Sequence, residues 1–205
     1  MNQFVILAVL AFSCIQAHAQ QATPPAVDWS LSATTSTYVV PDAGNYIETV
    51  ITADHRAVHF EGRYNYEGLD TGSAWIGYTF SAGSKFVFQV TPMVGAVFGR
   101  TTGIAPGQRI TLHWRRLELY SEDELVFSRN RVDSFFYTWS ELTVSPSPWL
   151  RIGLVGQRTR AYKSERDIQR GFLIGWSYKR VGITGNILNP DKQKALYIVS
   201  AQLEF

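Results

Sequence analysis

Apolar and polar residues alternate with period two along most of this chain. In residues 57–66 (AVHFEGRYNY), Val58 and Phe60 fall on one side of an extended chain, and His59 and Glu61 fall on the other. Successive side chains of a β-strand point to opposite faces, so this pattern predicts strands with one apolar and one polar face. No window of 12 or more residues repeats its apolar residues with helical spacing. We therefore expect an all-β fold.

Turn-forming residues divide the chain into about twelve strands, with ten as the alternative. Within residues 108–119 the apolar residues change from one face of the strand to the other at Leu117, after Arg115 and Arg116, which predicts a β-bulge there. The residues 121–123 are predicted to form the next turn. The predicted strands span 28–40, 46–53, 57–66, 73–81, 85–98, 108–119, 124–129, 133–144, 149–160, 168–178, 181–188 and 195–205.

The N-terminus has the pattern of a secretory signal peptide. An apolar run over residues 4–15 is shorter than the ~20 residues of a membrane-spanning helix, and the small-x-small triplet 17–19 (AHA) follows it. We predict a cleaved signal peptide at 1–19, a flexible leader at 20–27 and a single β-domain at 28–205. Lipidation of Cys14 is the alternative to simple removal of the signal.

Charge and cysteine content exclude several classes of protein. The chain has 19 basic and 17 acidic residues, a net charge of +2, which gives no strong field for nucleic acid. Its one Cys excludes a disulfide scaffold and a multi-Cys zinc site. A mean hydropathy of −0.07 argues against membrane-spanning helices, although alternating strands hide a lipid-facing side in such an average.

Two closed β-folds fit a secreted chain of this pattern: a soluble barrel or sandwich with its apolar face inward, and an outer-membrane barrel with that face outward. Short connections alternate with longer ones along the chain, as periplasmic turns alternate with outer loops in such barrels. Aromatic residues, which collect at membrane interfaces, also lie near strand ends on the apolar parity. They are Trp29, Tyr64, Tyr66, Tyr78, Phe80, Phe86, Phe98, Trp176, Tyr178, Tyr197 and Phe205.

The last strand carries a more specific signal. Tyr197, Val199, Leu203 and the terminal Phe205 share one parity. In this respect the sequence resembles bacterial outer-membrane β-barrel proteins, whose final strand typically ends in Phe after alternating apolar residues. The resemblance implies a closed antiparallel transmembrane barrel in a Gram-negative outer membrane. It also implies that the barrel-assembly machinery reads this strand during insertion, and that lipid and lipopolysaccharide surround the barrel.

In such a barrel the residues on the polar face of each strand line the lumen. The candidate lumen-lining residues are Glu48, His59, Glu61, Arg63, Gln89, His113, Arg115, Arg151 and Gln157. A twelve-stranded lumen lies between filled eight-stranded barrels and open porins, so these residues are predicted either to pair as a structural network or to contact a solute. His59 and Glu61 alone do not make a metal site, and no cofactor is expected.

Basic residues gather at the predicted outer end, where they are suited to lipopolysaccharide phosphates or to anionic solutes. The candidate rim comprises Arg129, Arg131, Arg158, Arg160, Lys163 and Arg166. We predict a passive pore for small polar or anionic solutes. The alternatives are a structural or adhesive barrel with a plugged lumen and, third, a lipid-modifying enzyme, for which no Ser lies in a nucleophile motif such as G-x-S-x-G.

Overall fold

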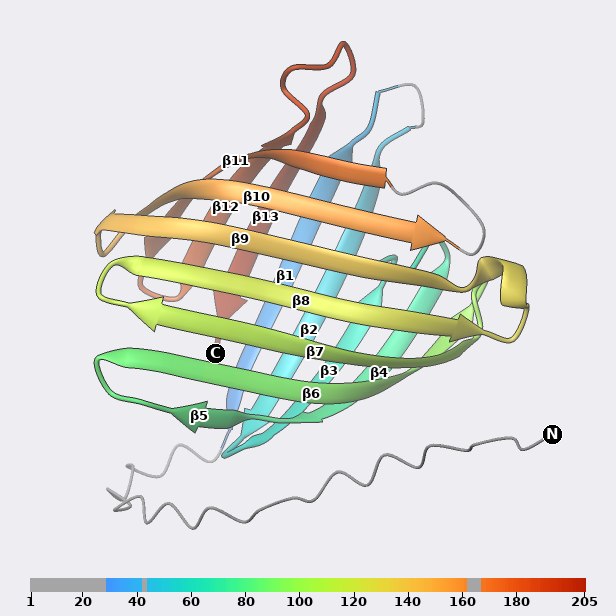
Figure 1. Ribbon diagram of the computed structural model, residues 1–205, viewed down its shortest axis with the longest axis horizontal. Coiled ribbons are helices and arrows are strands. Elements are labelled where there is room, and N and C mark those ends of the chain that lie inside the picture. The colour runs from blue at the N-terminus through green and yellow to red at the C-terminus, as the bar shows by residue number, and fades with distance from the viewer. Residues whose placement is uncertain (1–28, 42–43, 162–166) are drawn as a thin grey trace, which may run out of the picture.

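A computed structural model describes residues 29–41, 44–161 and 167–205, and nearly all of this is β-strand (Figure 1). The predicted signal peptide, the leader and Cys14 lie outside the described residues. The elements are β1 (Ser30–Val39), β2 (Tyr46–His55), β3 (Val58–Tyr64), β4 (Thr71–Tyr78), β5 (Phe80–Ala82), β6 (Phe86–Gly99), β7 (Gly103–Trp114), β8 (Leu117–Ser128), η1 (Arg131–Asp133), β9 (Phe135–Ser147), β10 (Leu150–Ala161), β11 (Asp167–Tyr178), β12 (Val181–Leu188) and β13 (Leu196–Glu204).

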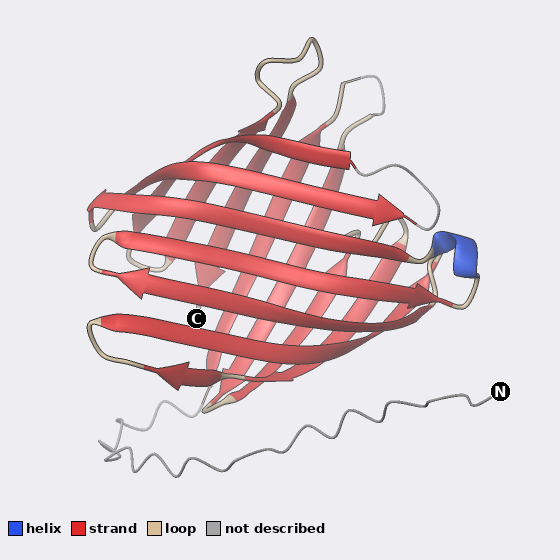
Figure 2. Cartoon of the chain, in the orientation of Figure 1, coloured by secondary structure: helices blue, strands red, loops and turns tan. Residues whose placement is uncertain are grey.

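The strands form one antiparallel sheet that closes on itself. Except for β4 and β5, each strand pairs with its neighbour in sequence, and β1 pairs with β13, for example at Thr35 opposite Ala201. The short β5 pairs only with β6, while β4 also pairs with β6, so twelve strands complete the circle (Figure 2). Closure pairs both edges of these twelve strands, as a sheet in lipid requires. The predicted closed barrel of twelve strands is confirmed.

The apolar face of this sheet points outward. Phe60 and Tyr64 on β3 are 38% and 52% exposed, whereas Glu61 and Arg63 between them are 4% exposed. Large exposed apolar side chains also occur on the other long strands, such as Ile174 at 59%. This orientation excludes the soluble alternative, in which the same parity would form the core.

The two ends of the barrel differ in the length of their connections. At one end two-residue hairpins join β2 to β3, β7 to β8 and β11 to β12, and in each the first turn residue has a positive φ. These residues are Arg56, Arg115 and Lys179. The other end carries longer connections, including 189–195 and the 129–134 segment with η1. By this asymmetry, the short turns mark the periplasmic end.

Two predicted strands, 108–119 and 124–129, have wrong boundaries, because β7 spans Gly103–Trp114 and β8 spans Leu117–Ser128. Arg115 and Arg116 form the hairpin between β7 and β8, not a bulge, and the predicted turn at 121–123 lies in the middle of β8. The apolar parity switches at Leu117 because a two-residue turn, not an extra residue, separates two strands.

Within the described part of the chain, no helix is long and apolar enough to cross a membrane.

Candidate functional site: the barrel lumen

A cluster of charged side chains is buried inside the barrel, where β3, β7 and β8 face one another. Strand alternation turns every second residue inward, so β3 contributes His59, Glu61 and Arg63 to the lumen. In the same way β8 contributes Glu122 and Glu124, which are 4% and 2% exposed. Buried charges are stabilised only when they are paired and hydrogen-bonded, and these residues are.

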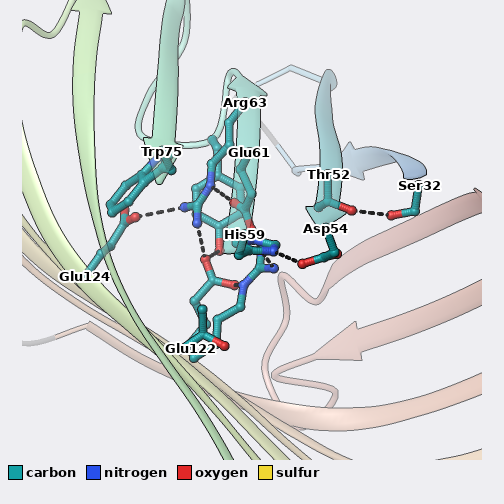
Figure 3. A network of polar contacts seen from close by, with 12 residues as sticks. Ser32, Thr52, Asp54, His59, Glu61, Arg63, Trp75, Glu122 and Glu124 are labelled. Carbon is teal, nitrogen blue, oxygen red and sulfur yellow. Dashed lines mark hydrogen bonds and ion pairs between the residues drawn. The ribbon is translucent and has the colours of Figure 1, made fainter. Parts of the chain in front are cut away.

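Arg63 is the centre of the cluster (Figure 3). Its Nε donates to Glu61 at 2.6 Å, and its terminal nitrogens reach Glu122 at 2.9 Å and Glu124 at 3.0 Å. Arg109 from β7 is the second cation, since it contacts Glu61 and lies 3.1 Å from Glu122. The two guanidinium groups therefore connect carboxylates of β3 with carboxylates of β8 across the lumen.

His59 extends this cluster toward the periplasmic end. Its Nδ1 lies 2.6 Å from an oxygen of Asp54 on β2, and its Nε2 lies 2.9 Å from Glu61. Ser32 and Thr52 continue the polar row on β1 and β2 with a 2.7 Å hydrogen bond between their hydroxyl groups (Figure 3). The polar network thus spans from the barrel centre to the base of β2.

Aromatic side chains complete the shell around the network. The hydroxyl groups of Tyr66 and Tyr120 donate to Glu122 at 2.8 and 2.6 Å. The Arg63 guanidinium stacks over the rings of Tyr66 and Trp75 at 4.3 and 4.4 Å, which adds cation–π attraction. The prediction that Tyr66 lies on the outer face is wrong. Tyr66 turns inward because β3 ends at Tyr64 and the positive φ of Asn65 breaks the alternation.

Trp75 anchors an apolar cluster behind the network. The cluster comprises Trp75, Met93, Val97, Ala105 and Val126, on β4, β6, β7 and β8. The indole is 3% exposed and lies so close to Gly95 that an added Cβ there would be 2.4 Å from its ring. This sector of the lumen is therefore filled by side chains.

The opposite sector is open. A cavity of about 410 Å³ lies between the network and the walls formed by β1, β2, β9, β10, β12 and β13. Its lining includes Thr34, Glu48, Arg151 and Asn186. A second cavity of about 490 Å³ lies toward the periplasmic turns and shares Asp54, His59, Arg109 and Tyr120 with the first. The two cavities are therefore adjacent along the lumen.

Apolar and aromatic residues narrow the lumen toward its outer end. Tyr38 stacks on Tyr46 with ring centroids 4.5 Å apart. Tyr38 and Ile198 belong to a second buried cluster, with Val155, Leu173 and Leu188, against which Trp139 packs. Tyr38, Ile198 and Trp139 also line the first cavity, so this cluster bounds the cavity at its outer end.

The predicted lumen-lining residues occupy several different places. The network holds His59, Glu61 and Arg63, while Glu48 and Arg151 line the first cavity and Gln89 lines the second. Arg151 donates to Glu141 at 3.1 Å. Gln157 shares the inward parity of the buried Val155 on β10, and its Oε1 has no hydrogen-bond partner among the described residues.

Two further predicted lumen residues lie at the periplasmic edge. His113 is exposed near the end of β7. Arg115 does not lie on a strand wall as predicted, because it is the first residue of the β7–β8 hairpin. Its guanidinium lies 5.2 Å from the centre of the Trp114 ring.

The candidate rim residues are only partly described. Arg129 and Arg131 are exposed in the connection between β8 and β9. Arg158 and Arg160 lie on β10. Lys163 and Arg166 lie outside the described residues, as does the side-chain environment of Arg160. The proposed contact of this rim with lipopolysaccharide stays a prediction.

On the last strand, Tyr197, Val199 and Leu203 point outward with 48%, 53% and 41% of their surface exposed, and Phe205 is 61% exposed. Their recognition by assembly machinery stays a prediction.

Four charged residues described above in the network were not predicted for the lumen: Asp54, Arg109, Glu122 and Glu124. Glu122 lies in the predicted turn at 121–123, Glu124 starts the predicted strand 124–129, and Arg109 lies near the start of the predicted strand 108–119. Asp54 directly follows the predicted strand 46–53. The missed signal is the alternation Glu122, Glu124, Val126, which continues the inward parity of β8 once the hairpin is placed at Arg115 and Arg116.

Among the described residues, no group of three or more His, Cys, Asp or Glu side chains is arranged to hold a metal ion.

No protein-family model matches the sequence, and no curated protein matches it significantly. Solved structures do match. The fold is similar to that of KdgM porin, with a TM-score of 0.61 and 13% identity over 85% of this chain and 99% of that chain.

A second structure, of KdgM porin in complex with disordered oligogalacturonate, gives a TM-score of 0.60 and 12% identity over 86% of this chain and 99% of that chain. The closed barrel, its outward apolar face and these similarities define the class: a porin-like barrel of the bacterial outer membrane. Within that class its architecture is similar to that of KdgM porin, at an identity that shows the fold alone.

Proposed function

We propose that this protein is a passive outer-membrane channel for small polar solutes, and that it favours cationic and neutral solutes over anionic ones. The observation that supports the proposal is the charge of the main cavity. Its lining carries the carboxylates of Glu48, Asp54, Glu118, Glu122 and Glu141 against the guanidinium groups of Arg109 and Arg151.

This excess of carboxylates bears on the choice of solute. A cleft lined by one sign of charge raises the local concentration of ions of the opposite sign. Sequence reasoning included anionic solutes because the outer loops are basic, but the charge of the lining argues against that part of the prediction. The oligogalacturonate in the complex with KdgM porin is a ligand of that protein, and the 12% identity does not carry it over to this chain.

Planar-bilayer recording of the purified protein tests the proposal. In a salt gradient we expect single-channel events whose reversal potential has the sign of cation selectivity. Liposome swelling with small neutral sugars should proceed, and should fall as the sugar becomes larger, because aromatic residues narrow the outer end of the lumen. Anion selectivity would contradict the charge argument, and absence of channel events would contradict the channel itself.

Glu141→Gln sharpens this test. Glu141 accepts a hydrogen bond from Arg151, so its neutralisation leaves an unpaired guanidinium in the cavity wall. We expect the cation-to-anion permeability ratio to fall. Asp133→Asn in η1 is the matched control, since Asp133 is exposed in an outer connection and should leave the ratio unchanged.

A structural barrel with a plugged lumen is the second candidate. The buried network and the apolar cluster around Trp75 favour it, because both occupy space that a wide pore leaves to water. A barrel that folds and inserts but gives neither channel events nor liposome swelling would support this candidate over the channel.

A further inference from the structure

The lipid-facing side of the barrel is not apolar everywhere. On the neighbouring strands β7, β8, β9 and β10, a group of polar side chains points outward among apolar ones. We call this group the β7–β10 patch; its members are Gln108, Ser121, Asp123, Thr138, Ser140 and Arg158.

Register and parity place the patch on one continuous area of the outer wall. Asp123 pairs with Gln108 on one side and with Thr138 on the other, and Thr138 pairs with Arg158. Ser121 pairs with Ser140. Along β8, Ser121 and Asp123 alternate with the buried Glu122 and Glu124, so their side chains point outward. The residues paired with Ser121 and Asp123 on the neighbouring strands point to the same side of the sheet. The four strands lie side by side on one wall (Figure 1).

Apolar residues flank the patch along its strands. On β8, Leu119 lies on the periplasmic side and Leu125 on the outer side, and both are more than a third exposed. On β7, Ile104 is 61% exposed on the outer side of Gln108. Ser121 and Asp123 therefore lie within the apolar band of the barrel, where a charged side chain facing lipid is destabilising.

Among the described residues, the two charges of the patch have no ion-pair partner. Over residues 29–41, 44–161 and 167–205, Asp123 has only the amide of Gln108, at 3.4 Å, and forms no ion pair. Arg158 has a buried Nε without a hydrogen-bond partner among the described residues, and its guanidinium lies 5.6 Å from the centre of the Phe136 ring. Neither charge is neutralised among the described residues, so an ion pair with a partner would compensate both.

We propose that the β7–β10 patch is the contact surface for a second copy of this chain. In this dimer a two-fold axis parallel to the membrane normal runs between the two copies beside β9, which lies between β8 and β10. Rotation about that axis places β8 of one copy opposite β10 of the other. Asp123 then faces Arg158 of the second copy, and the reverse pair forms at the same time. The small side chains of Ser121 and Ser140 let the two walls approach closely, as small residues do between membrane-embedded elements.

Site-directed cross-linking tests the arrangement. In a Cys14→Ala background, Ser140→Cys lies near the axis and should give a disulfide-linked dimer of twice the monomer mass when isolated outer membranes are oxidised. Ala74→Cys on β4 is the control, because this outward residue lies on a different part of the wall and should give no dimer.

A charge exchange tests the pairing. Asp123→Arg and Arg158→Asp should each abolish the Ser140→Cys cross-link, because each sets like charges against each other, and the double exchange should restore it. Folding of every variant is checked by its far-ultraviolet circular dichroism. A folded Ser140→Cys protein that forms no dimer, or that links to a different protein, overturns the proposal. A double exchange that fails to restore the dimer also overturns it.

Discussion

The two sides of the lumen use polar residues in different ways. On the side of β3, β4, β6, β7 and β8, charged groups are mostly buried and bound to one another, with Trp75 packed behind them. On the side of β1, β9, β10, β12 and β13, polar groups line a cavity of about 410 Å³, and Arg151 keeps 34% of its side chain exposed. The same alternation therefore produces a packed interior on one side and a polar-lined cavity on the other.

The reason for this difference is the distribution of partners. Arg63 and Arg109 meet carboxylates from both β3 and β8, so the charges neutralise one another across the lumen. The opposite wall carries mainly hydroxyl and amide side chains, such as Ser36, Thr184 and Asn186, which are small or uncharged and do not cross the lumen. A sector filled by side chains of the wall thus narrows the barrel.

The largest effect is expected from breaking the packed side. Arg63→Ala leaves Glu61, Glu122 and Glu124 without their shared cation, and removal of one partner from a buried ion pair costs about 3–5 kcal/mol. The measurement is the free energy of unfolding in urea, from detergent micelles.

Arg151→Ala is the matched variant on the open side. Its partner Glu141 stays in contact with the cavity, and we expect a loss of about 1 kcal/mol or less, as for partly exposed pairs. Equal losses for the two arginine variants would contradict the contrast between the two sides.

A smaller effect is expected from overpacking the same side. Gly95→Val adds a Cβ at 2.4 Å from the buried Trp75 ring, and overpacking of this kind costs about 1–3 kcal/mol. Gly62→Val on the outward face of β3 is the control, since no atom lies within 4 Å of the added Cβ. Urea unfolding of both variants is the measurement, and an unaffected Gly95→Val would mean that the Trp75 sector is not tightly packed.

The smallest effect is expected outside the barrel wall. Asp191 accepts a hydrogen bond from Arg170 at 3.2 Å, and its pKa is lowered first by a hydrogen bond from its own backbone and then by Arg170. A lowered pKa means that the contribution to stability is present at neutral pH and is lost as the pH falls through the lowered value.

Because Asp191 is exposed, solvent screens this contribution and makes it small, so Asp191→Asn should lower the unfolding midpoint only slightly at neutral pH and still less at pH 3. A clear loss of stability in this variant would show that the outer connection, and not only the lumen, holds the barrel together.

Much of the fold was predictable from alternation, and the misplaced residues have a common cause. The segment Ser121–Asp123 has the composition of a turn, but Glu122 is drawn into the lumen by Arg63 and Arg109 while its neighbours face outward. Local composition does not reveal such partners, because they lie more than ten residues away on other strands. Arg109 was not recognised as a lumen residue for the same reason.

The alternation of apolar and polar residues in the sequence by itself determined the strands, their inward and outward faces and their approximate number. It does so because successive side chains of a pleated strand point to opposite faces. Only the tertiary structure decided which inward residues meet. Glu61 and Glu124 lie 63 positions apart, and closure of the sheet brings both to Arg63. Whether a polar residue pairs with another or lines a cavity depends on what the curved wall places opposite it, and that is a property of the closed barrel.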